Sequence, residues 1–134
     1  MTPPPVEGLV PLLQVFDMPR ALAFYRDLLG FDVIEQSPGD DTCDWAWLRR
    51  GSAQLMLNTM YEADERPANP DFTRSAAHQD TGLFIGTPDV DAMFAYLRAK
   101  GMNVAPPVVQ DYGMKQLYVA DPDGYALCFQ APVR

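Results

Sequence analysis

The sequence predicts an α+β fold made of two copies of one βαβββ module. Three observations lead to this prediction: an internal repeat, a helical pattern that ends at glycine in each copy, and short apolar segments divided by turn residues. A length of 134 residues fits one domain of two halves. We expect the modules at residues 8–59 and 81–131, joined by residues 60–80.

The repeat is visible when the first copy is displaced by 71 positions. Ala21 then falls on Ala92, Tyr25 on Tyr96, Gly30 on Gly101 and Val33 on Val104. These matches occupy positions where a helix would pack or end, which makes them informative about structure.

Each copy contains one helix with a recognisable start and end. Proline suits the first helical turn because its φ is already set and no hydrogen bond is lost, so the helices begin at Pro19 and Pro88. Asp17 and Thr87 are the candidate caps. Helices commonly end at a glycine in the left-handed conformation, here Gly30 and Gly101.

Strands surround each helix. One strand precedes each helix, within residues 8–16 and at residues 82–86. The strands that follow are expected at residues 31–36, 45–49, 54–58, 103–109, 116–120 and 125–130. The intervening turns contain glycine, proline, aspartate and serine, the residues that tight turns favour.

Composition excludes several classes of function. The formal net charge of −8 opposes binding to phosphate backbones and anionic membranes, so we expect no nucleic-acid or membrane partner. No apolar run approaches the roughly 18 residues of a membrane-spanning helix, and no secretory leader is evident, so we expect a cytoplasmic protein. Cys43 and Cys128 are too few and too far apart for a disulfide framework and are expected to be reduced, structural thiols.

Residues 60–80 are polar and interrupted by Pro67 and Pro70, as in a linker or a lid. His78, the one histidine, is expected to be a solvated residue of this loop. The acidic residues of the loop, Glu62, Asp64 and Glu65, are expected to form wet surface.

Two segments carry a family resemblance. Residues 17–31, DMPRALAFYRDLLGF, and residues 121–125, DPDGY, resemble the vicinal oxygen chelate superfamily, which includes glyoxalases, extradiol dioxygenases and bleomycin resistance proteins. The resemblance extends over about residues 8–131. It implies two curved mixed sheets around a cavity that is completed in a homodimer, in which strands or modules of two chains can exchange.

Enzymes of this superfamily bind a divalent metal through the first and last strand of each module. The corresponding positions hold Val10 and Met56 in the first module, and Gly82 or Thr81 and Cys128 in the second. Divalent ions prefer oxygen or imidazole ligands, so we expect no metal, no other cofactor and no catalytic residue. A shift of the placement would allow Gln14 or Gln54 to point inward instead.

Within the superfamily, the sequence looks most similar to the metal-free bleomycin resistance proteins. Residues 44–46, DWA, and 112–115, YGMK, fall where those proteins carry aromatic residues of the binding cleft, which makes Trp45 and Tyr112 candidate stacking walls. Ordinary packing is the alternative for both, and is the expected role of Trp47. The other candidate ligand-binding residues are Gln54, Met56, Asn58, Phe84, Cys128 and Gln130.

The predicted function is metal-independent binding of a small, planar or cationic organic molecule. Stacking and a few hydrogen bonds would hold such a ligand, and the negative charge would attract a cation. A glyoxalase-type lyase, isomerase or dioxygenase is the first alternative. An interaction module with a filled cavity is the second.

Overall fold

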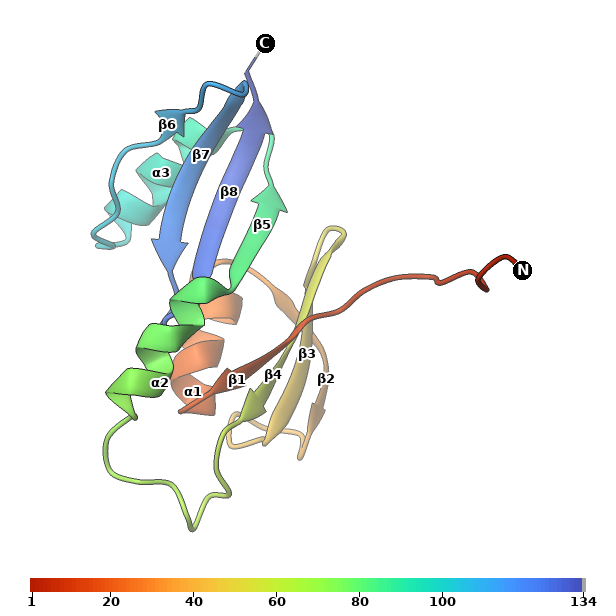
Figure 1. The fold of residues 1–134 in the computed structure, drawn as a ribbon. Coiled ribbons are helices and arrows are strands. Elements are labelled where there is room, and N and C mark those ends of the chain that lie inside the picture. Colours follow the sequence, from red (N-terminus) through yellow and green to blue (C-terminus); the bar gives the residue numbers. More distant parts are fainter. Residues whose placement is uncertain (134) are drawn as a thin grey trace. The chain divides into compact units, whose positions relative to one another are not determined.

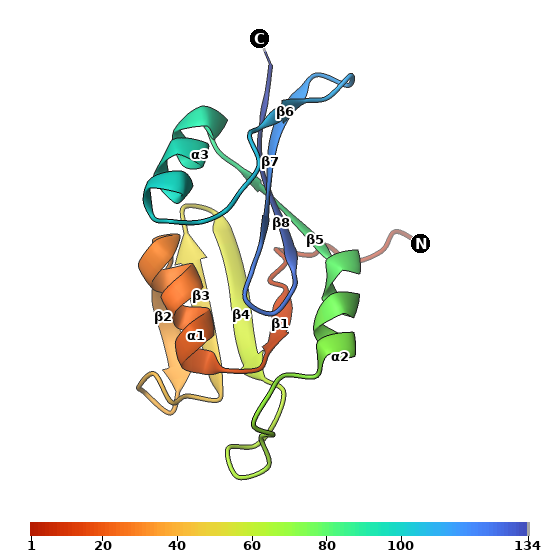
Figure 2. The ribbon, with the colours of Figure 1, turned by 90° about the vertical axis from the view of Figure 1, so that its left-hand side faces the viewer.

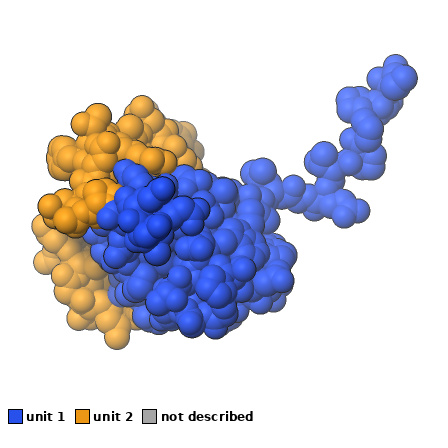
Figure 3. Space-filling view, turned by 90° about the horizontal axis from the view of Figure 1, so that it is seen from below, with its two compact units in different colours: residues 1–66 blue, residues 67–134 orange. Residues whose placement is uncertain are grey.

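The computed structural model describes residues 1–133 and confirms the α+β fold class. Two four-stranded mixed sheets, neither of them closed, are each accompanied by helices in two repeated modules (Figure 1). The chain folds as two compact units, residues 1–66 and 67–134, which are coloured separately in Figure 3.

The first unit contains one βαβββ module. Its strand order is β1-β4-β3-β2, with β1 parallel to β4 and the other pairs antiparallel. The α-helix α1 continues directly into the π-helical segment η1. The elements are β1 (Leu12–Val15), α1 (Met18–Leu22), η1 (Ala23–Leu28), β2 (Asp32–Ser37), β3 (Trp45–Arg50) and β4 (Ala53–Thr59).

The core of the first unit lies between its helix and one face of its sheet, which α1 covers in Figure 2. Alternate strand residues such as Ala46, Leu48 and Leu57 are fully buried, as are Leu22 and Tyr25 of the helix. Burying each of the larger side chains stabilises the fold by roughly 1.5–3 kcal/mol. Because side chains alternate along a strand, the residues between them point to the opposite face.

The second unit repeats this arrangement. Its strand order, β5-β8-β7-β6, matches that of the first unit, and β5 is parallel to β8. Leu97 of α3 is fully buried, as are Leu117 and Leu127 of the sheet. The elements are α2 (Phe72–Ala77), η2, a 3-10 turn (His78–Asp80), β5 (Gly82–Gly86), α3 (Val90–Ala99), β6 (Val108–Val109), β7 (Met114–Ala120) and β8 (Ala126–Pro132).

Both helices end at the predicted glycines, and Pro19 lies in the first turn of α1 as expected, but α3 begins at Val90, two residues after Pro88. Gly30 and Gly101 have φ of +80° and +89°, as expected for glycines that end helices. Asp17 occupies the capping position of α1 without a capping hydrogen bond from its side chain. Asp89, not Thr87, caps α3, because its carboxylate accepts a hydrogen bond from the backbone N–H of Ala92 at 2.9 Å.

Two predicted strands are shorter than expected. The strand expected within residues 8–16 covers Leu12–Val15, and Pro11 precedes it at the edge of the sheet. Of residues 103–109, Val108–Val109 alone form a strand. Pro106 and Pro107 explain the second difference, because proline has no N–H to donate to a neighbouring strand.

The connection at residues 60–80 is not a simple loop. Its second half forms α2 and η2, and the carboxylate of Asp71 caps α2 by accepting from the backbone N–H groups of Thr73 and Arg74. No residue of α2 is buried, so the segment lacks the apolar periodicity that would have predicted a helix.

Candidate functional site

Except for Tyr112, which precedes β7, the predicted ligand-binding residues lie on two sheet faces, one in each unit, opposite the face that packs against the helix. We call Trp45, Trp47, Gln54, Met56 and Asn58 the first face. We call Phe84, Gln116, Tyr118, Cys128 and Gln130 the second face. Strand register defines each set.

The first face combines two indole rings with amide groups. Trp45 lies opposite Asn58, and Trp47 lies opposite Met56, on the antiparallel pair β3–β4. The indole Nε1 of Trp47 donates to Gln54 Oε1 at 3.0 Å, so Trp47 joins this polar face in addition to packing on it. All five side chains are half-buried.

Gln14, which was expected as an alternative inward-pointing side chain, lies on this face. Gln14 of β1 lies beside Asn58, whose Nδ2 donates to Gln14 Oε1 at 3.3 Å. The same amide nitrogen donates to the backbone oxygen of Thr59 at 3.2 Å. The first face therefore presents neutral amides fixed by hydrogen bonds between neighbouring strands.

The second face is centred on Gln116, which is 3 % exposed. Its Oε1 accepts hydrogen bonds from the hydroxyls of Tyr112, at 3.0 Å, and Tyr118, at 3.2 Å. Its Nε2 donates to Gln130 Oε1 at 2.9 Å. Two phenols and two amides thus form one network.

Aromatic rings lie beside this network. Phe84 and Tyr118 pair with Cys128 from either side on β8, and their rings meet edge to face with centroids 6.5 Å apart. Phe84 is 57 % exposed, Tyr118 53 % and Tyr112 64 %. The face therefore offers π surfaces and hydrogen-bonding groups together.

Gln116 and Tyr118 were missing from the predicted residues. They lie two positions apart in a strand that was itself predicted, and Gln116 lies directly opposite Gln130. Two-residue periodicity along the strand places both on the face of Gln130, so the signal was present in the sequence.

The side chains present do not fit the divalent-metal centre implied for the enzymes. Nowhere in residues 1–133 do three His, Cys, Asp or Glu side chains come together in a way that could hold a metal ion. Cys128 is 1 % exposed, and its burial raises the pKa of the thiol, although the nearby Tyr118 hydroxyl acts in the opposite direction. Because thiolate is the form that binds metals, this shift disfavours coordination.

The lone histidine is not the solvated residue that the sequence predicted. His78 is half-buried, and its Nδ1 lies 2.6 Å from the backbone oxygen of Asp123.

Other predictions made for single residues agree with the structure. Glu62, Asp64 and Glu65 are exposed, as expected of a charged loop. Both cysteines, also as expected, are free and buried. None of the helices formed by residues 1–133 is long and apolar enough to cross a membrane.

Comparison with known proteins identifies the family. Solved structures with similar folds include TioX from Micromonospora sp. ML1, with a TM-score of 0.69 and 20% identity over 94% of this chain and 100% of that one. Lactoylglutathione lyase from Agrobacterium tumefaciens has a TM-score of 0.67 and 20% identity over 94% of both chains. A glyoxalase/bleomycin resistance protein/dioxygenase from Nocardioides has a TM-score of 0.74 and 17% identity over 98% of this chain and 87% of that one. No curated protein sequence matches the chain. The family model for the Glyoxalase/Bleomycin resistance protein/Dioxygenase superfamily matches residues 9–129, so the chain belongs to that superfamily.

Proposed function

We propose that the protein binds and sequesters a small organic molecule, planar or cationic, without a metal and without catalysing a reaction. The observation that carries this proposal is the second face, where Gln116, Tyr118 and Gln130 share one hydrogen-bond network with the neighbouring Tyr112 beside exposed rings. Ligand sites commonly combine such apolar walls with a few fixed polar groups.

The chemistry of the second face supports binding more than reaction. Desolvation raises the pKa of the Tyr118 phenol, and burial raises that of the Cys128 thiol. Both groups therefore stay protonated at neutral pH, where neither acts as a ready base or nucleophile. As neutral groups they are suited to hydrogen bonding with a ligand.

A cation suits this face for two reasons. The negative faces of exposed aromatic rings attract positive charge, with about 0.5–1 kcal/mol expected at an exposed site. The net charge of −8 also raises the local concentration of cations around the protein. On the first face we propose Trp45 as a second stacking surface for a planar group.

Isothermal titration calorimetry with N-methylphenanthridinium, a planar cation, tests the proposal. Its neutral analogue, phenanthridine, separates the effect of charge from that of shape. We expect Tyr112→Ala and Trp45→Ala each to weaken binding roughly three- to tenfold, the range of one lost aromatic contact. Phe72→Ala removes an exposed ring from α2, an element that contributes no residue to either face, and is the matched control.

Chelation and elemental analysis test whether the protein carries a metal and whether binding depends on it. Binding is expected to be unchanged after dialysis against EDTA, and elemental analysis of untreated protein is expected to find no stoichiometric metal. About one Mn, Fe, Ni or Zn per chain, or unchanged binding in both ring variants, would contradict the proposal.

We further propose that a second copy of the chain completes the site. The exposed rings of Phe84, Tyr112 and Tyr118 support this, since clustered exposed aromatic side chains often mark an interface. Sedimentation at micromolar concentration is expected to show a dimer, and a monomer would rule out a shared cleft. We expect such a dimer in the cytoplasm, which fractionation of cells expressing the full chain would test.

A glyoxalase-type lyase remains the second candidate, because one structural neighbour is named lactoylglutathione lyase. Turnover of the hemithioacetal of methylglyoxal and glutathione, measured with and without added Ni²⁺ or Zn²⁺, distinguishes the two functions. The amide and phenol groups of the two faces predict no turnover above background.

A further inference from the structure

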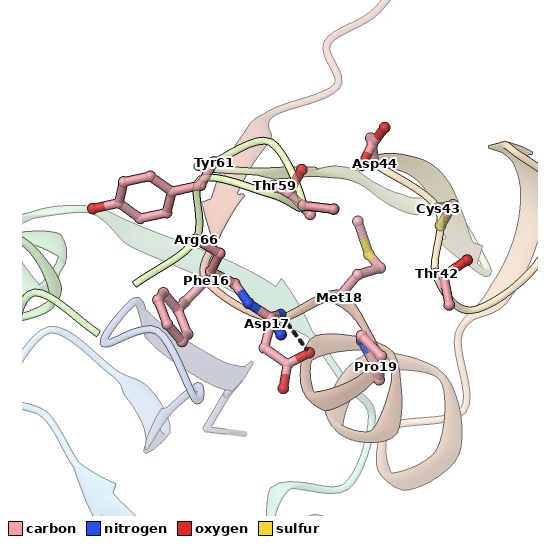
Figure 4. A pocket seen from close by; sticks show the side chains of 11 residues that line it. Phe16, Asp17, Met18, Pro19, Thr42, Cys43, Asp44, Thr59, Tyr61 and Arg66 are labelled. Atoms are coloured by element: carbon pink, nitrogen blue, oxygen red, sulfur yellow. Dashed lines mark hydrogen bonds and ion pairs between the residues drawn. The ribbon is translucent and has the colours of Figure 1, made fainter. Parts of the chain in front are cut away.

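The first unit contains a hollow that is distinct from the first face. Its volume is about 240 Å³, and it lies where β1 and β4 end and α1 begins (Figure 4). Its apolar lining includes the buried side chains of Met18 and Cys43, and Phe16, also buried, forms one wall. The hollow therefore borders the core of this unit.

Two aromatic rings and two carboxylates give the hollow its chemistry. Phe16 and Tyr61 meet edge to face with centroids 6.2 Å apart. Asp17 and Asp44 supply negative charge, Asp17 half-buried and Asp44 exposed. A ring face beside a carboxylate is the combination that recognises an organic cation.

The guanidinium group of Arg66 already lies beside Phe16 and Asp17. The guanidinium carbon of Arg66 lies 5.6 Å from the centre of the Phe16 ring. Its Nη1 lies 3.4 Å from Asp17 Oδ1, the contact drawn as a dashed line in Figure 4. Within residues 1–133, Arg66 is the one positively charged residue that lines the hollow.

This internal contact is weak enough to be exchanged. The Arg66 side chain is 44 % exposed and makes one long contact with the carboxylate in place of a bidentate pair. Arg66 also lies on the exposed segment that follows Tyr61, which gives the side chain room to move away.

We propose that this hollow is a binding site for a small organic cation carrying a guanidinium or ammonium group, and that Arg66 holds the cation position until the ligand displaces it. The ligand's charged group would lie over Phe16 and pair with Asp17. Its carbon chain would contact Met18 at the floor. The site is independent of the binding proposed for the sheet faces.

Titration of the ¹⁵N-labelled full chain with methylguanidinium tests the proposal by NMR. We expect the shift changes to concentrate at the backbone amides of Cys43, Asp44 and Thr59. Methylurea, which is neutral and of similar shape, is expected to cause none. Equal effects of both compounds, or changes spread over the whole chain, would overturn the proposal.

Variants of Arg66 test the competition. Arg66→Gln is expected to tighten methylguanidinium binding about fivefold, because the site is then no longer partly occupied. Arg66→Lys keeps the charge and is expected to bind like the wild type. Arg74→Gln makes the same change of net charge on α2, where it should alter affinity less than twofold. Equal affinities of Arg66→Gln and Arg74→Gln for methylguanidinium would overturn the proposal that the ligand displaces Arg66.

The carboxylate is tested in the background that lacks Arg66. Adding Asp17→Asn to Arg66→Gln is expected to weaken binding at least fivefold relative to Arg66→Gln alone, and an unchanged affinity would overturn the assignment of Asp17. Thermal unfolding verifies that each variant is folded. Tyr112→Ala is expected to leave methylguanidinium binding intact, so this test and that of the sheet faces can fail separately.

Discussion

The imidazole of His78 lies flat against the ring of Tyr125, with the ring centroids 4.1 Å apart and the planes at 9°. The same histidine reaches the backbone oxygen of Asp123 through Nδ1. These contacts attach the end of α2 and η2 to the turn at residues 121–124 within the second unit. The segment expected to be a linker is therefore anchored by its last residues.

Gly124 of the turn lies close to the backbone of this segment. Its φ is +88°, and a Cβ there would overlap the carbonyl oxygen of Ser75. We expect Gly124→Ala to lower the free energy of unfolding by about 3 kcal/mol or more, since left-handed strain and a backbone clash act together. Urea unfolding monitored by circular dichroism measures this loss.

Gly113 provides the matched control for Gly124. Its φ is +84°, but a Cβ there would meet no atom within 4 Å. Gly113→Ala should therefore cost only the conformational strain, about 1 kcal/mol. Equal losses of unfolding free energy in the two variants would show that the Ser75 carbonyl does not restrict the side chain at position 124.

Substitution of His78 separates its two contacts. His78→Phe keeps a flat ring against Tyr125 but removes the hydrogen bond, at an expected cost of about 1 kcal/mol. His78→Ala removes both and should cost about 0.5–1.5 kcal/mol more. Hydrogen exchange of α2 amides is expected to accelerate in the same order, and an unchanged rate in His78→Ala would contradict the anchoring role.

Cys128 predicts a loss of stability at alkaline pH. Burial raises its thiol pKa in the folded state, so the unfolded chain loses this proton first. The stabilisation is fully present below the ordinary thiol value of about 8.5 and declines as the pH rises from there towards the folded pKa. Cys128→Ala is expected to flatten this decline by up to about 1.4 kcal/mol per pH unit, as measured by urea unfolding from pH 7 to 10. Identical pH profiles would contradict the burial effect.

The net charge of −8 predicts salt-dependent capture of a cationic ligand. Stopped-flow measurement of N-methylphenanthridinium binding is expected to show an association rate that falls several-fold between low salt and about 0.5 M NaCl, because salt screens long-range attraction. The rate for phenanthridine, which is neutral, should change little. A salt effect of the same size for both compounds would exclude electrostatic attraction as its cause.

Local signals in the sequence were sufficient for most of the fold. The repeat, the glycines that end the helices and the two-residue alternation of apolar side chains are short-range patterns, and they predicted both βαβββ modules. They also placed Gln54, Met56 and Asn58 on one face, since strand periodicity determines which side chains of a strand share a face. Gln116 lay within reach of the same reasoning.

Tertiary structure alone decided the remaining features. Helix α2 buries no residue, so its position depends on the contacts of Ser75 and His78 with a turn more than 40 residues away. The hollow beside Phe16 likewise depends on Arg66, which lies 49 residues from its partner Asp17 along the chain. Contacts between residues so far apart leave no periodic trace in the sequence, because neither partner is constrained by its immediate neighbours.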